Sequence, residues 1–392
     1  MTLFLFWSGV FLIVYTYIGF PLFVILRGFL WSRPYKHEEL TSPPSVSIVI
    51  SVYNESKTIG EKLNNILSLN YPCGLLEVVI ASDGSNDGTD TIIERYKEQG
   101  VKLLSLPRLG KAAALNAAVT TSKGEVLVFS DANSMYKADA IQALVRPFID
   151  SRVGGVAGNQ IYLDEVSEGS SGDGERVYWS FDRILKLFQG KSGNTLAATG
   201  AIYAIRRSLF RSIPDSVADD FVTSTGVIAQ GYRLVFAPDA LAYEPVAATH
   251  RVEFGRKVRI IIRSWRAFIF MRELLNPFRY RFYSIQLFSH KILRYLVVFP
   301  LLLLFFVSPF LWKVSPFYQL ATIMQVIFYS FAILGLLLDK TRLGKMKILT
   351  IPFYFCMVNA ASLVAIVKAM SGHQIKYWEP QRQGKTQYEN VH

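Results

Sequence analysis

The sequence predicts an α/β domain with a mostly parallel sheet, flanked by membrane-spanning helices at both ends of the chain. Two observations support this fold class. Between about residues 43 and 250, apolar β-branched runs alternate with segments of helical spacing, the order typical of a doubly wound sheet. Long apolar runs occupy both ends of the 392-residue chain and account for its high hydrophobic content of 51%.

The first segment, residues 1–32, is expected to anchor the chain in a membrane. Residues 3–30 carry Arg27 as their only charge and exceed the about 20 apolar residues that cross a bilayer. A basic start and a small-residue cleavage site are both missing, which argues against a cleaved signal peptide. Arg33 and Lys36 follow the apolar run, so the positive-inside rule places the amino end outside and the next domain in the cytoplasm.

The central domain, residues 43–250, begins after a stiff Ser-Pro-Pro linker. Its buried strands and its helices are expected to follow each other along the chain. The expected strands are residues 46–52, 76–81, 101–106 and 126–129, and the expected helices are residues 59–67, 90–99 and a segment that opens at residues 109–116. Polar residues follow these strands directly, at the carboxyl edge where open α/β sheets bind ligands. The only cysteines, Cys73 and Cys356, lie far apart, so no disulfide framework is implied, as expected of a reducing cytoplasm.

The stretch that ends the fourth strand is the strongest candidate for a metal site. Asp131 and Asn133 lie two residues apart, directly after the apolar run. Their oxygen atoms suit a hard divalent cation that holds a diphosphate. The alternative is an ordinary turn after a strand.

The first two strands end in candidate nucleotide-binding residues. Asn54, Glu55 and Asp83 can accept hydrogen bonds from a uracil imide or from ribose hydroxyls. The alternative is that Asp83 and Asp87 cap the helix that begins near residue 89.

Lys111 stands at the start of the next helix, where a cation and free backbone N–H groups suit a phosphate or the donor sugar. The alternative is a surface lysine.

The second half of the domain contains an acidic pair, Asp219 and Asp220, before an expected helix at residues 222–231. A carboxylate there can serve as the base for an acceptor hydroxyl, and adjacent acids raise each other's proton affinity. A helix N-cap pair is the alternative. Residues 164–176, rich in glycine and serine, are expected to form a mobile surface loop. The small residues at 192–201 fit either a ligand-lining segment or a packing loop.

The segment at residues 251–280 mixes arginines, among them Arg256 and Arg259, with aliphatic and aromatic residues. Such an amphipathic helix is expected to lie in a membrane interface and to contact anionic lipids. A guanidinium also fits a diphosphate leaving group through paired hydrogen bonds.

The region at residues 281–370 holds about three further apolar segments, at residues 285–312, 318–338 and 349–370. The basic loop between the last two is expected in the cytoplasm. Counting spans then places the polar tail, residues 371–392, outside, but Lys376, Arg382 and Lys385 argue for the cytoplasm. A re-entrant or interfacial last segment would resolve this conflict.

From about residue 45 to residue 266, these motifs resemble in order those of the membrane-bound family 2 glycosyltransferases, which include cellulose, hyaluronan and poly-N-acetylglucosamine synthases. The resemblance implies a cytoplasmic GT-A domain that binds a nucleotide sugar with Mg²⁺ or Mn²⁺. Asp131 matches the family's D-x-D motif, in which Asn133 replaces the second acid. Asp220 matches the catalytic base, and Asp219 would position the site or the metal.

The family's Q-x-x-R-W motif maps onto Arg256, Arg259 and Ile260, so only the arginine is kept. The missing tryptophan, which stacks under the acceptor sugar in processive synthases, weakens the expectation of long-chain polymerisation.

The prediction is therefore a multi-pass, inverting glycosyltransferase of the cytoplasmic membrane. Its expected donor is a UDP-sugar, and its expected acceptor is a lipid-linked saccharide or a growing exopolysaccharide. Membrane lipids, other polysaccharide-assembly proteins or a second copy of the chain are the expected partners, and nucleic acid is not. Two alternatives are a catalytically impaired scaffold subunit and a transporter regulated by the soluble domain. Four spans without an acidic residue give the transporter little support.

Overall fold

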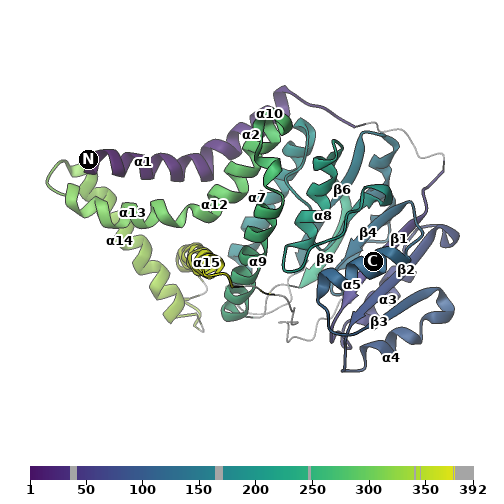
Figure 1. Ribbon diagram of the computed structural model, residues 1–392. Helices are drawn as coiled ribbons and strands as arrows, with labels where there is room; N and C mark the ends of the chain where they lie inside the picture. Colours follow the sequence, from purple (N-terminus) through teal and green to yellow (C-terminus); the bar gives the residue numbers. More distant parts are fainter. Residues whose placement is uncertain are drawn as a thin grey trace.

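The computed structural model describes residues 1–35, 42–163, 171–245, 249–339, 341–344, 346–373 and 375. Within this part of the chain, an eight-stranded sheet and its covering helices form one end of the molecule, and long apolar helices form the other (Figure 1). The predicted class, an α/β domain with apolar helices on both sides of it in the sequence, is confirmed.

One half of the sheet consists of four parallel strands in the order β3, β2, β1, β4. They are β1 (Val46–Val52), β2 (Leu76–Asp83), β3 (Val101–Leu106) and β4 (Val126–Ser130). Ile48 pairs with Val78 on one side and with Val128 on the other. The carboxyl ends of these strands therefore meet at one edge, as the sequence predicts.

The other half of the sheet is mixed, and the sequence analysis predicted neither its strands nor their directions. β4 pairs antiparallel with β7, β7 pairs antiparallel with β6, and β6 runs parallel to β8. The strands are β5 (Met135–Tyr136), β6 (Val153–Leu163), β7 (Tyr203–Arg206) and β8 (Arg233–Pro245). A period of two residues marks a strand but carries no information on the direction of its neighbour.

Two hydrophobic cores form because successive side chains of a strand point to opposite faces. Ile48 and Ile50 of β1 belong to one core, and Val49 belongs to the other. The first core includes α3 (Ile59–Leu67), α4 (Thr89–Glu94) and α6 (Ala140–Val145); the second includes α5 (Lys111–Thr121) and α8 (Asp219–Ala229). The helices of each core thus fix the loops at the carboxyl edge of the sheet.

Two longer helices connect the sheet domain to the apolar end. α7 (Ser171–Ser192) packs against α2 and β8, and α9 (His250–Phe270) packs against α15. The predicted loop at residues 164–176 is wrong from residue 171 onward, because α7 begins there; its first part lies outside the described residues. Glycine and serine in that stretch lower helix propensity, but packing of a long helix can override propensity.

The apolar helices match the predicted segments closely. α1 (Thr2–Val14), a π-helical stretch (Tyr15–Gly19) and α2 (Phe20–Leu30) form one continuous run. The next run is bent by 49° between residues 282–296 and 298–311. Its elements are α11 (Phe282–Leu287), a π-helical stretch (Phe288–Ile292), α12 (Leu293–Leu296), α13 (Val298–Val307) and a 3₁₀ turn (Ser308–Leu311).

α14 (Pro316–Leu337) and α15 (Lys347–Met370) complete the apolar end. Among the described residues, three helices are long and apolar enough to cross a membrane, or four if the bent pair counts as one span. Short helical turns make up the remaining described elements: Cys73–Leu75, Lys97–Gln99, Arg146–Ile149, Arg207–Leu209, Arg272–Leu275 and α10 (Pro277–Tyr280).

Candidate active site

Asp83, at the end of β2, joins its loop to the loop that follows β3. Its Oδ1 accepts hydrogen bonds from the backbone N–H groups of Leu109 at 2.7 Å and Gly110 at 2.9 Å, and its Oδ2 accepts one from Arg108 at 3.0 Å. Gly84 has a φ of 74°, and a Cβ there would lie 2.9 Å from the Arg108 nitrogen. Asp83 is 2% exposed, and its hydrogen bonds to Leu109 and Gly110 hold the loop that leads into Lys111.

Arg108 is a site residue that the sequence analysis missed. Its guanidinium lies 3.1 Å from the centre of the ring of Tyr53, the residue that directly follows β1. A stacked guanidinium and ring offer a flat surface of the kind that binds a nucleobase. The sequence could have identified Arg108, because it closely follows the third strand, just as acidic residues follow the first two strands.

Asn54 and Glu55 hold the same edge of the sheet together. The Asn54 side chain accepts a hydrogen bond from Asn86 N at 2.9 Å, and Glu55 accepts one from Thr58 at 2.8 Å at the start of α3. The capping alternative holds for Asp87, whose Oδ1 accepts from Thr89 N at 3.1 Å. The structure therefore brings the three predicted nucleotide-binding residues to one edge, where each also stabilises a loop.

Asp131 lies at the centre of the candidate metal site. Its Oδ1 accepts a hydrogen bond from Lys111 Nζ at 2.8 Å. A Cβ on Gly200 would lie 2.8 Å from Asp131 Oδ2, closer than real Cβ contacts allow. The small residues at 192–201 thus let the backbone approach this carboxylate.

The turn that carries Asp131 and Asn133 rests on a buried lysine that the sequence analysis missed. Lys62 of α3 is fully buried, donates a hydrogen bond to the Ser134 carbonyl and lies 3.8 Å from the centre of the Tyr136 ring. Burial lowers the pKa of Lys62 to about 7, although Asp131 and Glu244 oppose the shift. The contact joins residues 72 apart, so local pattern could not reveal it.

Asp219 is held between two cations at the start of α8. Its Oδ2 lies 3.1 Å from Lys111 Nζ, and its Oδ1 accepts a hydrogen bond from Arg263 at 3.0 Å. Burial opposes its charge, but Lys111 and Arg263 hold the pKa of Asp219 below the ordinary value. Burial likewise opposes the charge of Lys111, and Asp131 and Asp219 raise its pKa. Lys111 therefore joins the candidate metal site to the acidic pair.

Asp220, the adjacent acid, lies in a different environment. Its Oδ1 accepts a hydrogen bond from Phe221 N at 2.8 Å. Burial and the charge of Asp219 raise the pKa of Asp220, while Lys111 and Lys291 oppose the shift. A carboxylate of raised pKa is a better proton acceptor than an ordinary aspartate.

The arginines of α9 have different neighbours, and the one that reaches the acidic pair was not predicted. Arg256 Nε lies 2.6 Å from Glu253 within the helix, and its guanidinium lies 5.9 Å from the centre of the Tyr162 ring. Arg259 is half-buried one turn further along. Arg263 is the arginine that reaches the acidic pair. It follows Arg259 by one helical turn, so the four-residue repeat of this face could have identified it.

The residues present fit a divalent cation that also binds a diphosphate. Among the described residues, no group of three or more acidic, histidine or cysteine side chains is arranged to hold a metal ion. Asp131 and Asn133 supply a carboxylate and an amide oxygen from one turn, and the remaining ligands would come from phosphate oxygens and water, as is usual for Mg²⁺.

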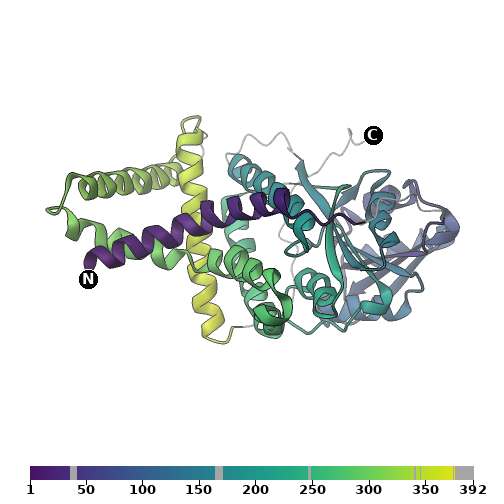
Figure 2. The ribbon, with the colours of Figure 1, turned by 90° about the horizontal axis from the view of Figure 1, so that it is seen from above.

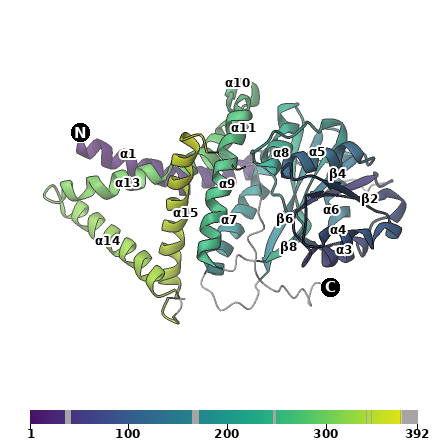
Figure 3. The ribbon, with the colours of Figure 1, turned by 60° about the horizontal axis from the view of Figure 1, so that its bottom comes forward.

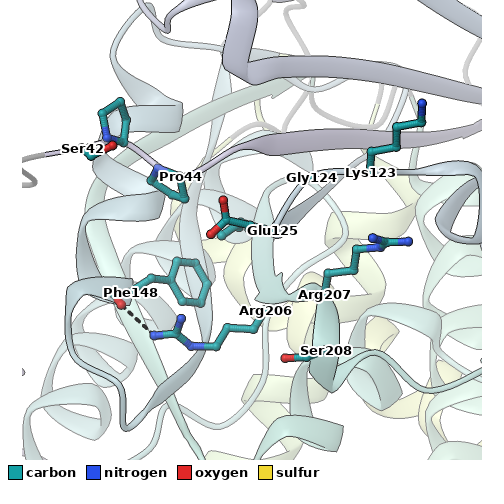
Figure 4. Close-up of a pocket in the computed structure, with 11 residues that line it drawn as sticks. Ser42, Pro44, Lys123, Gly124, Glu125, Phe148, Arg206, Arg207 and Ser208 are labelled. Carbon is teal, nitrogen blue, oxygen red and sulfur yellow. Dashed lines mark hydrogen bonds between the residues drawn. The ribbon is translucent and has the colours of Figure 1, made fainter.

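An open cavity of about 800 Å³ lies elsewhere, at the amino ends of β1 and β4 (Figure 4). Lys123, Glu125 and Arg206 line it, and none of the predicted site residues does. Arg206 donates hydrogen bonds to the carbonyls of Phe148 at 2.6 Å and Val153 at 2.8 Å, so it ties the strands together. This cavity is therefore separate from the candidate active site.

Comparison with known proteins agrees with this arrangement. Residues 47–213, which include β1 to β4 and the Asp131 turn, match the family model described as Glycosyl transferase family 2. The chain carries a family 2 glycosyltransferase domain. This confirms the resemblance seen in the sequence and the enzyme class.

Two of the curated relatives are bacterial proteins. The chain is 21% identical over 369 residues to the probable glycosyltransferase YdaM of Bacillus subtilis, covering 86% of this chain and 84% of the relative. It is 26% identical over 265 residues to a poly-beta-1,6-N-acetyl-D-glucosamine synthase of Staphylococcus aureus, covering 65% of this chain and 63% of the synthase. The match thus spans less than two thirds of the synthase.

A solved structure supports the fold. The mannosyltransferase PcManGT from Pyrobaculum calidifontis, in complex with GDP-Man and Mn²⁺, matches with a TM-score of 0.70 and 23% identity. The match covers 94% of this glycosyltransferase and 100% of that chain. The predicted GT-A fold is therefore confirmed.

Proposed function

We propose that this glycosyltransferase is an inverting enzyme of the cytoplasmic membrane, with its catalytic domain in the cytoplasm. It transfers a sugar from a nucleoside-diphosphate sugar to a lipid-linked saccharide or a growing exopolysaccharide. The observation that carries the proposal is Lys111, whose ammonium lies 2.8 Å from Asp131 and 3.1 Å from Asp219. This lysine brings the candidate diphosphate site next to the candidate base.

The donor would lie along the carboxyl edge of β1, β2 and β4. Tyr53 and Arg108 provide a flat surface for its base, and the loops held by Asn54, Glu55 and Asp83 surround that surface. The UDP-sugar expected from the sequence and the GDP-Man bound by PcManGT share a diphosphate. Lys111 fits that group because it is a point charge at the start of a helix.

Asp131 and Asn133 would hold Mg²⁺ or Mn²⁺. When bound, the metal supplies positive charge to the diphosphate as the sugar leaves. Lys111 and Arg263 are fixed cations of the chain that add to this charge without reorganising, since both are already held by carboxylates. Arg256 stays a predicted donor contact, and Arg259 stays a predicted catalytic residue that would stabilise the charge of the leaving diphosphate; in the structure Arg256 pairs with Glu253.

Asp220 would take the proton from the acceptor hydroxyl. That oxygen then attacks C1 from the side opposite the leaving diphosphate, which inverts the configuration at C1. Asp219 is occupied by two cations, whereas burial and Asp219 raise the pKa of Asp220. Lys291, which lowers that pKa, belongs to the first apolar run of the C-terminal region. This location favours an acceptor that arrives from the membrane side.

Release of nucleoside diphosphate by purified protein in nanodiscs tests the proposal. A panel of UDP- and GDP-sugars is offered with Mg²⁺ or Mn²⁺, with an acceptor fraction extracted from membranes. Asp220→Asn is expected to lower turnover by about 100-fold or more, the usual contribution of a general base, and to leave nucleotide binding intact. Asp215→Asn, at an exposed carboxylate of the preceding loop, is the matched control.

A scaffold subunit that has lost its chemistry is the rival function. Asn133 in place of an acid and Ile260 in place of tryptophan favour it. Nucleotide binding without release for every donor, equal in the Asp220→Asn variant, would support the scaffold and overturn the proposed enzyme.

A further inference from the structure

α15 has the length and composition of a membrane span, but its direction differs from that of α1 and α13. In Figure 2 it runs across the axis of α1, whereas α13 packs along α1. Two helices that cross so steeply cannot both run along the bilayer normal. If α1 and α13 span the membrane, α15 lies in its plane.

The packing of α1, α13 and α14 favours these three as the spans. A Cβ on Gly9 of α1 would lie 3.0 Å from the side chain of Leu304 of α13, so the two helices approach closely. The Trp7 ring stacks on Phe317 at the start of α14, with centroids 5.7 Å apart. Only 28% of the most apolar 18-residue stretch of the run Thr2–Leu30 and 11% of that of α14 is buried, which leaves both to contact lipid.

α15 packs on α9 of the catalytic domain as well as on α14, and 56% of its most apolar 18-residue stretch is buried. It lies beside α9 (Figure 3), and the contact is extended along both helices. His250 lies edge-on to Phe353, with centroids 4.7 Å apart, and Ile262 belongs to the same cluster as Ala361 and Ala365. The small side chains of Ala361 and Ala365 are fully buried there.

The two ends of α15 carry the same kind of charge. The loop before it contains Lys340, Arg342 and Lys345, and the tail after it contains Lys376, Arg382 and Lys385. That loop is tied to the catalytic domain, because Asp339 Oδ1 lies 2.7 Å from His250 Nε2 at the start of α9. The positive-inside rule therefore assigns both flanks to one side of the membrane.

We infer that α15 lies in the surface of the bilayer on the side of the catalytic domain and does not cross it. Its exposed apolar side chains contact the acyl chains below the lipid headgroups, and the tail stays on the catalytic side. Those side chains are Val364 and Val367, which lie one turn apart on the exposed face of its second half. The inference rests on the membrane anchoring in the proposed function. It resolves the conflict between span count and tail charge.

Labelling of single cysteines tests both the anchoring and the inference. In a background of Cys73→Ser and Cys356→Ala, cysteine is introduced at Lys347 or Lys368, the exposed ends of α15. Lys123→Cys reports the side of the catalytic domain, and Lys313→Cys reports the turn between α13 and α14. A membrane-impermeant maleimide is applied to intact cells and to inverted vesicles.

Positions 347, 368 and 123 are expected to react from the same side, and position 313 from the other. Reaction of positions 347 and 368 from opposite sides would show that α15 is a span and would overturn the inference alone. Reaction of positions 123 and 313 from the same side, or recovery of the protein in the soluble fraction, would overturn the anchoring and the inference with it.

Discussion

At the scale of single residues, the acidic pair shows how different neighbours move the pKa values of two adjacent aspartates in opposite directions. Asp219 is held by Lys111 and Arg263, and its charge raises the pKa of Asp220. A base must be unprotonated to act, so activity is lost as the pH falls through the raised pKa.

Replacing Asp219 by asparagine removes the negative charge that raises the pKa of Asp220. We expect the acid limb of the kcat/KM profile to move to lower pH, together with a loss of rate because Lys111 and Arg263 lose their partner. The position of the limb, measured over a range of pH, is independent of the loss of rate. Asp215→Asn should leave the limb in place, and an unmoved limb in the Asp219 variant would contradict this electrostatic link.

Gly200 provides a second residue-scale prediction. Its Cβ in a Gly200→Ala variant would lie 2.8 Å from Asp131 Oδ2, so the carboxylate must shift. We expect the Mn²⁺ concentration for half-maximal activity to rise about 10-fold, the lower range for disturbing a residue that orients a metal ligand. Gly226→Ala is the matched control, because nothing lies within 4 Å of its added Cβ. Equal metal dependence in both variants would refute the role of Gly200.

The sequence predicted the carboxylates of the candidate site and Lys111, but missed three further cations, Lys62, Arg108 and Arg263. Asp83, Asp131 and Asp220 follow strands or begin a helix, and such positions are visible in local pattern. Lys62 acts on a partner 72 residues away, so only the packed fold reveals it, whereas the helical repeat of α9 could have identified Arg263.

At the scale of elements, the sequence located the four parallel strands and the helices between them, but not the strands of the mixed half of the sheet. The four parallel strands follow from alternation with helices, whereas the antiparallel pairing of β7 depends on long connections. The apolar segments were predicted nearly to the residue because length and hydropathy define them. Their orientation was not, because α15 and α14 have similar composition and different neighbours.

The contact between α9 and α15 gives a prediction at this scale. Ala361 is fully buried there, and leucine would overpack the contact at a cost of about 1–3 kcal/mol. We expect Ala361→Leu to lower the Tm of the protein in nanodiscs. Ala360→Leu changes the exposed neighbour on the same helix and should leave the Tm unchanged. A Tm that responds equally to both changes would argue against the packing of α15 on α9.

At the scale of the whole molecule, the apolar end and the catalytic domain both contribute charges that act on the candidate active site. Lys291 belongs to a π-helical stretch of the first C-terminal apolar run, and its charge lowers the pKa of Asp220. The same stretch contacts the N-terminal run, since the hydroxyls of Tyr15 and Ser289 lie 2.8 Å apart. Both apolar regions thus help to define the environment of the candidate base.

Replacing Lys291 by glutamine should therefore move the acid limb of kcat/KM to higher pH, opposite to the effect of Asp219→Asn. The sign follows because loss of a nearby positive charge makes the Asp220 carboxylate easier to protonate. Lys313→Gln, at the far end of the apolar helices, should leave the limb in place. Shifts in the same direction for Lys291→Gln and Asp219→Asn would mean that the limb does not report Asp220. Opposite shifts would tie the catalytic pH dependence to a residue that the membrane helices hold in place.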